Sequence, residues 1–568
     1  MKPLRLRAAL VISVLVTASV LPLGIRAAAD VVYDAMQAEL KRSMSLSLKQ
    51  LEKPYFISYS IDDGKTWSAT AAHGGLLSAH AGQFRRPEVQ VRVGDYNFDN
   101  TNGGGGRGRG GASYELSGFP LDDDPLIIRQ YLWLETDSAY KGAVQAIAQK
   151  RAAQGSVNVA EQLPDFAAAK PFTLMEDRPL AAFDDKTWND RIRRVSALFE
   201  KYANLRDSVV TYSAVDGVHR YINSEGTEVR QMQSEGSVQL AASVQSPDGM
   251  MLRDSASFYS QELPKMPTED ELASAARNMS EQLTKLAAAP MGDAYSGPIL
   301  FEGVASAQLL AEVLGRNLHM TRPATGGRGG AGGRGGRGGP GGRGGGGATE
   351  LEGRRGVRIM PDMFNVVDDP TLPLFGHTEV DNEGVPSKPV SLVEKGVLKD
   401  FLRTRLPVQG FTESNGRALL GNSPAPTNLI VSTTEKSPVA DLRRKLIDLS
   451  KQRGLAYGVI VRKLDFPSLG GGGGGAVAAP LYVYRLYADG HEEMIRGVRL
   501  RNVDARSLKD ILLAGDDTAT LDYLEGGSAE VTVAAPSVLM DDLELEKVND
   551  TLPKLPIAPS PLVAQTAK

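Results

Sequence analysis

Glu312 and Arg316 lie four residues apart in the apolar segment 304–318, the spacing that places two side chains on one face of a helix. A carboxylate such as that of Glu312 can act as a general base. The guanidinium of Arg316 stays protonated and has no lone pair to offer a metal ion. The spacing therefore favours an ion pair, which on a helix surface stabilises by about 0.3–0.5 kcal/mol.

The usual zinc-binding side chains form no metal-site pattern elsewhere in the sequence. There is no cysteine, which excludes thiol mechanisms and disulfides, and none of the six histidines is spaced like a metal ligand. An unorthodox site that combines His319, His377 and Glu379 is one alternative. Taken singly, we expect each histidine to be structural or solvent-facing.

Several short motifs follow this segment in a fixed order. They occupy residues 376–386 (GHTEVDNEGVP), 392–398 (LVEKGVL), 403–405 (RTR), 414–417 (SNGR), 496–498 (RGV) and 535–539 (APSVL). Together with residues 295–318, their order and spacing resemble the TldD/PmbA family of peptidases, and the similarity extends over roughly residues 295–545. The N-terminal half fits more loosely, through residues 91–95 and 223–227.

The resemblance gives the segment around Glu312 a specific interpretation. In the catalytic branch of the family the corresponding helix carries His-Glu-x-x-x-His, and a later cysteine completes a zinc site. Here Ala311 and Arg316 occupy the two histidine positions, whereas Glu312 and Gly315 match the motif. Because neither replacement can donate to zinc, we expect these to be degenerate zinc positions and predict no metal or other cofactor. Glu312 is then the only candidate catalytic residue. A second hypothesis is that Arg316 places a fixed positive charge at the metal position and holds a cleft in shape.

The resemblance also implies a complex in which a catalytic subunit pairs with a non-catalytic one that lacks the zinc motif. We expect this chain to be such a non-catalytic, TldE-like subunit of a peptide-cleaving complex, either with a zinc-motif paralogue or as a homo-oligomer. It could bind unfolded peptides as strands added to an exposed sheet edge. The alternatives are an active metallopeptidase with non-standard ligands and a stand-alone envelope peptide-binding protein, so the sequence leaves open whether the chain is an enzyme.

Residues 1–29 have the pattern of a secretory signal, in which basic residues precede an apolar run at 8–23 and three alanines at 27–29 offer a cleavage site. We therefore expect an exported protein, periplasmic or secreted, with an uncleaved anchor as the alternative. No later segment is long and apolar enough to cross a bilayer.

The charge balance gives no argument for nucleic acid, because the formal net charge is only -4. The arginines of the glycine-rich tract have no aromatic residues between them, which also argues against RNA binding. We predict no nucleic-acid partner.

Periodicity predicts an α+β protein with two domains, residues 30–290 and 291–550, followed by a Pro-rich tail at 551–568. Flexible glycine-rich loops are expected at 103–111, 324–350 and 470–475. Amphipathic helices are predicted at about 32–51, 188–202, 268–288 and 438–452, the third with Thr268 and Glu271 as a capping box. Asp-Gly pairs at 63–64, 216–217 and 489–490 predict hairpin turns, the last between strands 481–487 and 492–500.

Overall fold

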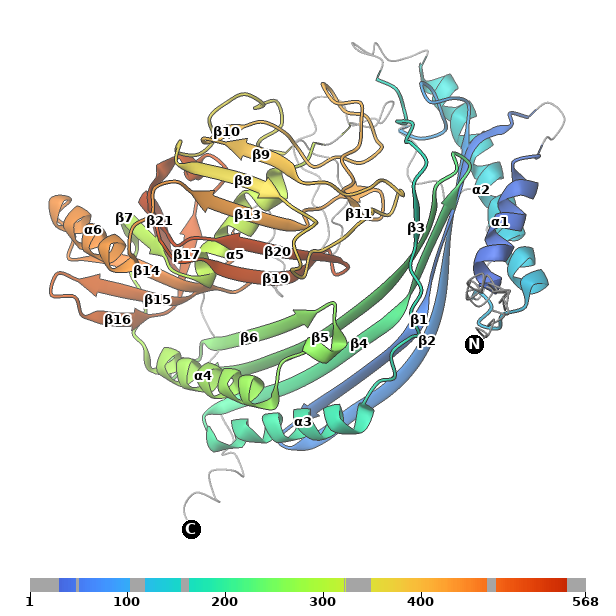
Figure 1. The fold of residues 1–568 in the computed structure, drawn as a ribbon. Coiled ribbons are helices and arrows are strands. Elements are labelled where there is room, and N and C mark those ends of the chain that lie inside the picture. Colours follow the sequence, from blue (N-terminus) through green and yellow to red (C-terminus); the bar gives the residue numbers. More distant parts are fainter. Residues whose placement is uncertain are drawn as a thin grey trace, which may run out of the picture.

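The computed structural model describes residues 30–46, 51–102, 118–154, 163–320, 322, 349–466 and 477–548 (Figure 1). The predicted signal at 1–29, the glycine tracts and the tail at 551–568 lie outside these residues. Strands and helices alternate without a dominant parallel sheet, which confirms the α+β class. No helix in the described part is long and apolar enough to cross a membrane.

The N-terminal half is built on one six-stranded sheet with the order β2-β1-β4-β5, to whose last strand β3 and β6 both pair. Its strands are β1 (Pro54–Ala72), β2 (Gly75–Val93), β3 (Thr173–Met175), β4 (Leu205–Asn223), β5 (Glu228–Gln245) and β6 (Met251–Ser260). The long antiparallel strands curve around the C-terminal half, so that one face of the sheet looks toward it (Figure 1).

Four helices accompany this sheet: α1 (Val31–Ser43), α2 (Pro125–Gln154), α3 (Asp185–Ala197) and α4 (Glu269–Ala288). The first two pack on the outer side of the sheet, and the other two pack near its opposite end (Figure 1). The capping box at Thr268 and Glu271 is confirmed at the start of α4. Helix α2 was not predicted from the sequence. Its apolar residues do not lie on one face alone, because Leu126, Ile127 and Trp133 are exposed, so the periodicity of an amphipathic helix is weak.

Two of the predicted Asp-Gly turns are wrong, because β1 and β4 run straight through them. Gly64 pairs directly with Gly217 in the register of the two strands. A Cβ on Gly64 would lie 2.7 Å from the carbonyl oxygen of Asp216, and one on Gly217 would lie 2.5 Å from that of Asp63. The glycines are therefore needed for close approach of two central strands and not for a reversal of the chain.

The C-terminal half places helix α5 (Val304–Val313) between two sheets. One sheet has the order β10-β9-β8-β13-β20-β19, and the other β16-β15-β14-β7-β21-β17, with β18 also paired to β21. Their strands are β7 (Tyr295–Phe301), β8 (Phe364–Asp368), β9 (Val390–Glu394), β10 (Val397–Leu398), β13 (Asn428–Thr433), β14 (Tyr457–Leu464), β15 (Pro480–Tyr487), β16 (Glu492–Ile495), β17 (Val498–Arg501), β18 (Ile511–Ala514), β19 (Ala519–Glu525), β20 (Ala529–Ala535) and β21 (Val538–Lys547), and a small hairpin joins β11 (Ala418–Leu420) to β12 (Ser423–Pro424).

Helix α6 (Val439–Gln452) covers the outer face of the β7-containing sheet. Alternation along the strands assigns each side: Leu300 and Ile460 pack against α6, whereas Ile299 and Phe301 face the core around α5. This half is thus a helix, a sheet, a buried helix and a second sheet in succession.

The predicted hairpin at Asp489-Gly490 is confirmed between β15 and β16, but a single second strand over 492–500 is wrong. The chain breaks at Gly497, which has a φ of +69°, a value that favours glycine. Beyond it, β17 pairs with β21 instead of β15.

We predict that Gly64→Ala destabilises the protein by about 1–3 kcal/mol, because the added methyl group overlaps backbone that cannot move without shifting β4. Urea denaturation followed by circular dichroism measures the change. Gly142→Ala in α2 is the matched control, since its Cβ would meet no atom within 4 Å. Equal stability of Gly64→Ala and the parent chain would contradict the close-approach argument.

Candidate functional site

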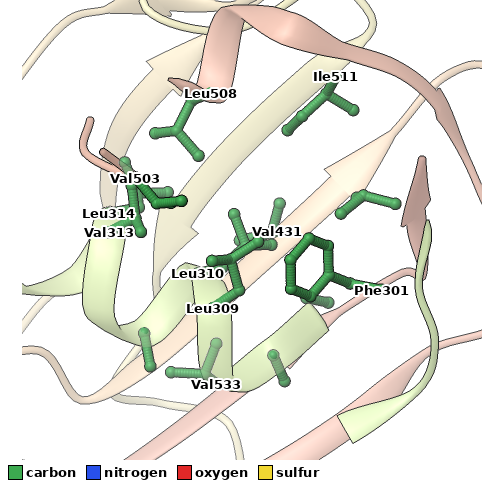
Figure 2. Packing of buried hydrophobic residues seen from close by; sticks show 14 of the residues in the cluster. Phe301, Leu309, Leu310, Val313, Leu314, Val431, Val503, Leu508, Ile511 and Val533 are labelled. Carbon is green, nitrogen blue, oxygen red and sulfur yellow. The ribbon is translucent and has the colours of Figure 1, made fainter. Parts of the chain in front are cut away.

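Helix α5 carries the residues on which the sequence argument rests, and it is buried along its whole length from Ala305 to Val313. Its apolar side chains pack on both sheets at once. Figure 2 shows Leu309, Leu310 and Val313 among Phe301 of β7 and Val533 of β20. A helix that is buried on all sides must find partners for its polar groups inside the protein.

Glu312 lies in this interior, with only 6% of its surface exposed. A guanidinium nitrogen of Arg316 lies 3.3 Å from its Oε1 atom, which confirms the predicted ion pair. The expected surface position is wrong, because the carboxylate is buried and only the arginine is partly exposed. Its Oε2 atom accepts the backbone N–H of Ala478 at 2.5 Å.

Gln308, one turn earlier on the same face of α5, has a similar role. Its Oε1 atom accepts the backbone N–H of Leu464, the last residue of β14, at 2.8 Å. Ala478 lies two residues before the start of β15, so Gln308 and Glu312 together hold the two ends of the connection between β14 and β15. Glu312 is therefore engaged by an N–H donor and a guanidinium, which is an anchoring arrangement.

Ala311 is 1% exposed and belongs to the main apolar core of the C-terminal half. Gly315 follows the helix in a short turn. A Cβ atom on this residue would lie 3.6 Å from the side chain of Leu429. Ala311, the first degenerate zinc position, thus lies within the apolar core, whereas Arg316, the second, lies at the edge of that core and is partly exposed.

The alternative site of His319, His377 and Glu379 is not assembled. Within the described residues, which include all three, no group of three or more histidine or acidic side chains is arranged to hold a metal ion. The backbone of His319 forms an isolated parallel β-bridge with Leu402, and burial lowers the pKa of the His319 imidazole. His377 instead lies 2.8 Å from the carbonyl oxygen of Pro370, through its Nδ1 atom.

A cleft of about 880 Å³ opens beside α5, between the two halves of the chain. Val304 and Gln308 of α5 line it, together with α4, β14 and β15. Two sheet edges also line it: residues 254–259 of β6 and residues 520–523 of β19. Its volume exceeds those of three other cavities in the described part of the chain, which are about 220, 330 and 180 Å³.

A polar cluster crosses the cleft and ties the halves together. Asp254 of β6 receives a 2.5 Å contact from the Lys463 ammonium and a hydrogen bond from the Tyr482 hydroxyl. Lys463 also donates to the carbonyl oxygen of Ser255 at 2.7 Å. Burial, with Asp254 nearby, raises the pKa of Tyr482 far above its usual range, so the phenol remains a donor. On the opposite wall, burial raises the pKa of Asp522.

Residues 345–547 match the sequence model described as the PmbA/TldA metallopeptidase C-terminal domain. This region of the chain belongs to the TldD/PmbA family. Two curated relatives named "Metalloprotease" support this assignment, one from Archaeoglobus fulgidus, 46% identical over 59 residues, and one from Methanothermobacter thermautotrophicus, 37% identical over 81 residues. The matches cover 10% and 14% of this chain, and only 14% and 18% of those proteins.

Solved structures show that the TldD/PmbA resemblance extends to the fold of the whole chain. TldE from Thermococcus kodakarensis has a TM-score of 0.54 at 13% identity and covers 90% of this chain and all of its own. A protein from Thermotoga maritima described as a modulator of DNA gyrase has a TM-score of 0.55 at 16% identity, with 86% of this chain and 96% of that one covered. A similarly described protein from Bacteroides thetaiotaomicron has a TM-score of 0.54 at 12% identity, with coverage of 91% and 98%.

Sequence reasoning for this TldD/PmbA member missed Gln308 and the cleft-spanning cluster. Gln308 stands at i-4 from Glu312, and that spacing is a signal that could have paired the two residues. Asp254 and Lys463 are 209 residues apart, and no local pattern joins them.

We predict that the double variant Ala311→His, Arg316→His does not bind zinc and is less stable by about 1–3 kcal/mol, because an imidazole must enter a closely packed core. Thermal unfolding with and without zinc, together with metal analysis of the purified protein, measures both effects. The single variant Arg316→His is the control that isolates the loss of the guanidinium. One tightly held zinc ion per chain, with a higher Tm, would show instead that the zinc-site geometry survives.

Proposed function

We propose that this chain is an exported, non-catalytic, TldE-like subunit that works with a zinc-motif paralogue to cleave peptides. The observation that carries the proposal is the state of Glu312, which is buried and bonded to Ala478 and Arg316 while its neighbour Ala311 offers no ligand. A general base needs access to a water or substrate proton. We include export in the proposal because residues 1–29 have the pattern of a secretory signal.

The cleft beside α5 supports a role in holding extended peptides. Both β6 and β19 end their sheets, so each presents an edge to the cleft. The carbonyl oxygen of Ser255 already points into the cleft, since it accepts the Lys463 ammonium. In an antiparallel pair, alternate residues direct their backbone groups to the same side. Ser257 therefore presents its N–H to the cleft as well. A peptide that adds a strand to this edge would be held through its main chain, with little dependence on its sequence.

Co-expression with a zinc-motif paralogue tests the proposed role directly. We expect the two chains to purify together and to hydrolyse unfolded peptides, with all zinc in the paralogue, whereas this chain alone does not hydrolyse them. Chelator-sensitive hydrolysis by the isolated chain would favour an active peptidase with non-standard ligands. Failure to associate with any such paralogue, with peptide binding retained, would favour a stand-alone binding protein.

The variant Ser257→Pro tests the sheet edge. Proline removes the N–H that faces the cleft but is tolerated on an edge strand. We expect peptide affinity to fall about fivefold, which corresponds to about 1 kcal/mol for one lost hydrogen bond. Fluorescence anisotropy with a labelled unfolded peptide measures the affinity. Ser257→Ala is the matched control, because it keeps the N–H, and equal effects of the two variants would contradict binding at this edge.

A further inference from the structure

A second, separate groove lies between the inner face of the N-terminal sheet and the loops of the C-terminal half. It consists of two adjoining cavities of about 220 and 330 Å³. The two cavities adjoin, because five residues line both of them: His219, Gln233, Asn382, Leu419 and Ser528. None of these residues lines the cleft beside α5.

Carboxyl groups dominate the charge of this groove, and the residues that line the two cavities include no lysine or arginine. Asp62, Glu88 and Glu383 line one cavity, and Glu235 and Glu530 line the other. They come from four strands and one loop, so the accumulation of negative charge is a property of the fold.

Glu383 is the most constrained of these groups, with 6% of its surface exposed. Its Oε2 atom accepts the backbone N–H of Arg405 at 2.7 Å, and among the described residues no donor reaches its other oxygen. The guanidinium of Arg405 does not neutralise it fully, because that group is bonded to Glu225 at 2.6 Å and to the carbonyl oxygen of Ala167 at 2.9 Å. Glu383 therefore lines the groove as a nearly buried carboxyl group with one hydrogen-bond donor among the described residues.

The other carboxyl groups are also short of cations. Glu530 has one hydrogen-bond donor, the side-chain amide of Gln261, and burial raises its pKa to about 8. Burial likewise raises the pKa of Glu235, for which no hydrogen-bond donor is found in the described part of the chain. Burial and the neighbouring Asp381 raise the pKa of Glu383. Asp62 is the exception, since its Oδ1 atom lies 2.6 Å from His219 Nδ1.

The carboxyl groups are spread along the strands. Glu88 pairs with Ser60, which pairs with Tyr221, whereas Glu235 pairs with Val215. Six residues of β4 separate these two levels, or about 20 Å at the usual rise per residue. A single ion does not span that distance, and within the described residues no three histidine or acidic side chains are arranged for a metal.

We propose that this groove binds a flexible organic cation that carries several ammonium groups. Ammonium groups would bond to the carboxylates at the two ends, and the intervening alkyl chain would lie along Leu419 and the amide side chains of the shared wall. The same chemistry occurs in a free polyamine and in the side chains of a lysine-containing peptide. This site is independent of the cleft and of the peptide-cleaving role proposed above.

The affinity of the groove for such a cation should depend on pH. A bound cation favours the ionised carboxylate, so it lowers the raised pKa values and releases protons. Affinity therefore increases as the pH rises through the range of about 6 to 8, in which Glu530 loses its proton. The other titratable or charged groups near these carboxyl groups are His219 and His377, which line the groove, and Arg92 and Arg405 beside Glu383.

Isothermal titration of the full chain with spermidine, at pH 6 and pH 8 and constant ionic strength, tests the proposal. We expect binding at pH 8 that is about tenfold tighter than at pH 6, with proton release seen as a dependence on the buffer's ionisation enthalpy. The double variant Glu235→Gln, Glu530→Gln should weaken binding about tenfold or more. Glu413→Gln is the matched control, because Glu413 is exposed and outside the groove, and it should bind like the parent chain.

If the double variant fails to fold, the single variant Glu235→Gln is titrated with spermidine instead, and it too should bind more weakly than the parent chain. This variant should fold, since no hydrogen bond among the described residues depends on the carboxyl group of Glu235. A peptide with three lysines, titrated in parallel, distinguishes the sources: tighter binding than spermidine assigns the site to peptide side chains, and weaker binding assigns it to a free polyamine. Absence of spermidine binding overturns the proposal. So does equal weakening by Glu413→Gln, or magnesium chloride that binds as tightly and responds to the same variants.

Discussion

The enclosure of α5 between two sheets is the constraint on which the rest of the C-terminal half depends. Because the helix is buried on every side, each polar group that it carries must be matched from within the protein. Ser306 donates to the carbonyl oxygen of Pro536, Gln308 accepts from Leu464 and Glu312 accepts from Ala478. These bonds fix the β14–β15 connection and the start of β21 to the same helix. Hence a residue type associated with catalysis serves here to order the chain around it.

The interdomain surfaces follow from the curvature of the N-terminal sheet. One face of this sheet wraps the C-terminal half (Figure 1). Polar contacts join the two halves at several points. Arg405 is 0% exposed and joins Glu225 and Ala167 of one half to its own loop in the other. A buried guanidinium is stable only when its partners are in place. The relative position of the halves is therefore specified by a few directional bonds in addition to apolar packing.

Whether a structural element could be predicted from the sequence depends on whether the interactions that determine it are local. Helices α4 and α6 and the β15–β16 hairpin follow from periodicity, a capping box and a turn within a few residues, and all were predicted. The Asp-Gly pair at 63–64 carries the same local signal as the one at 489–490, yet only the latter makes a turn. What distinguishes them is the partner strand, since Gly64 meets Gly217 from 153 positions later in the chain. The ion pair of Glu312 and Arg316 was predictable from spacing, but the burial of Glu312 was not, because burial is decided by sheets whose strands lie within residues 295–301, 364–398 and 428–547.

The position of β7 sets a limit on how the C-terminal half can be divided. This strand, with α5 directly after it, precedes residue 345, where the family match begins. In the sheet, β7 lies between β14 and β21, pairing parallel with the first and antiparallel with the second. An excised segment 345–547 would lack its central strand and the helix that fills its interior, leaving two unpaired edges and an empty core. The autonomous folding unit must therefore start upstream, and its sheet stays open during synthesis until the last strand, β21, has emerged.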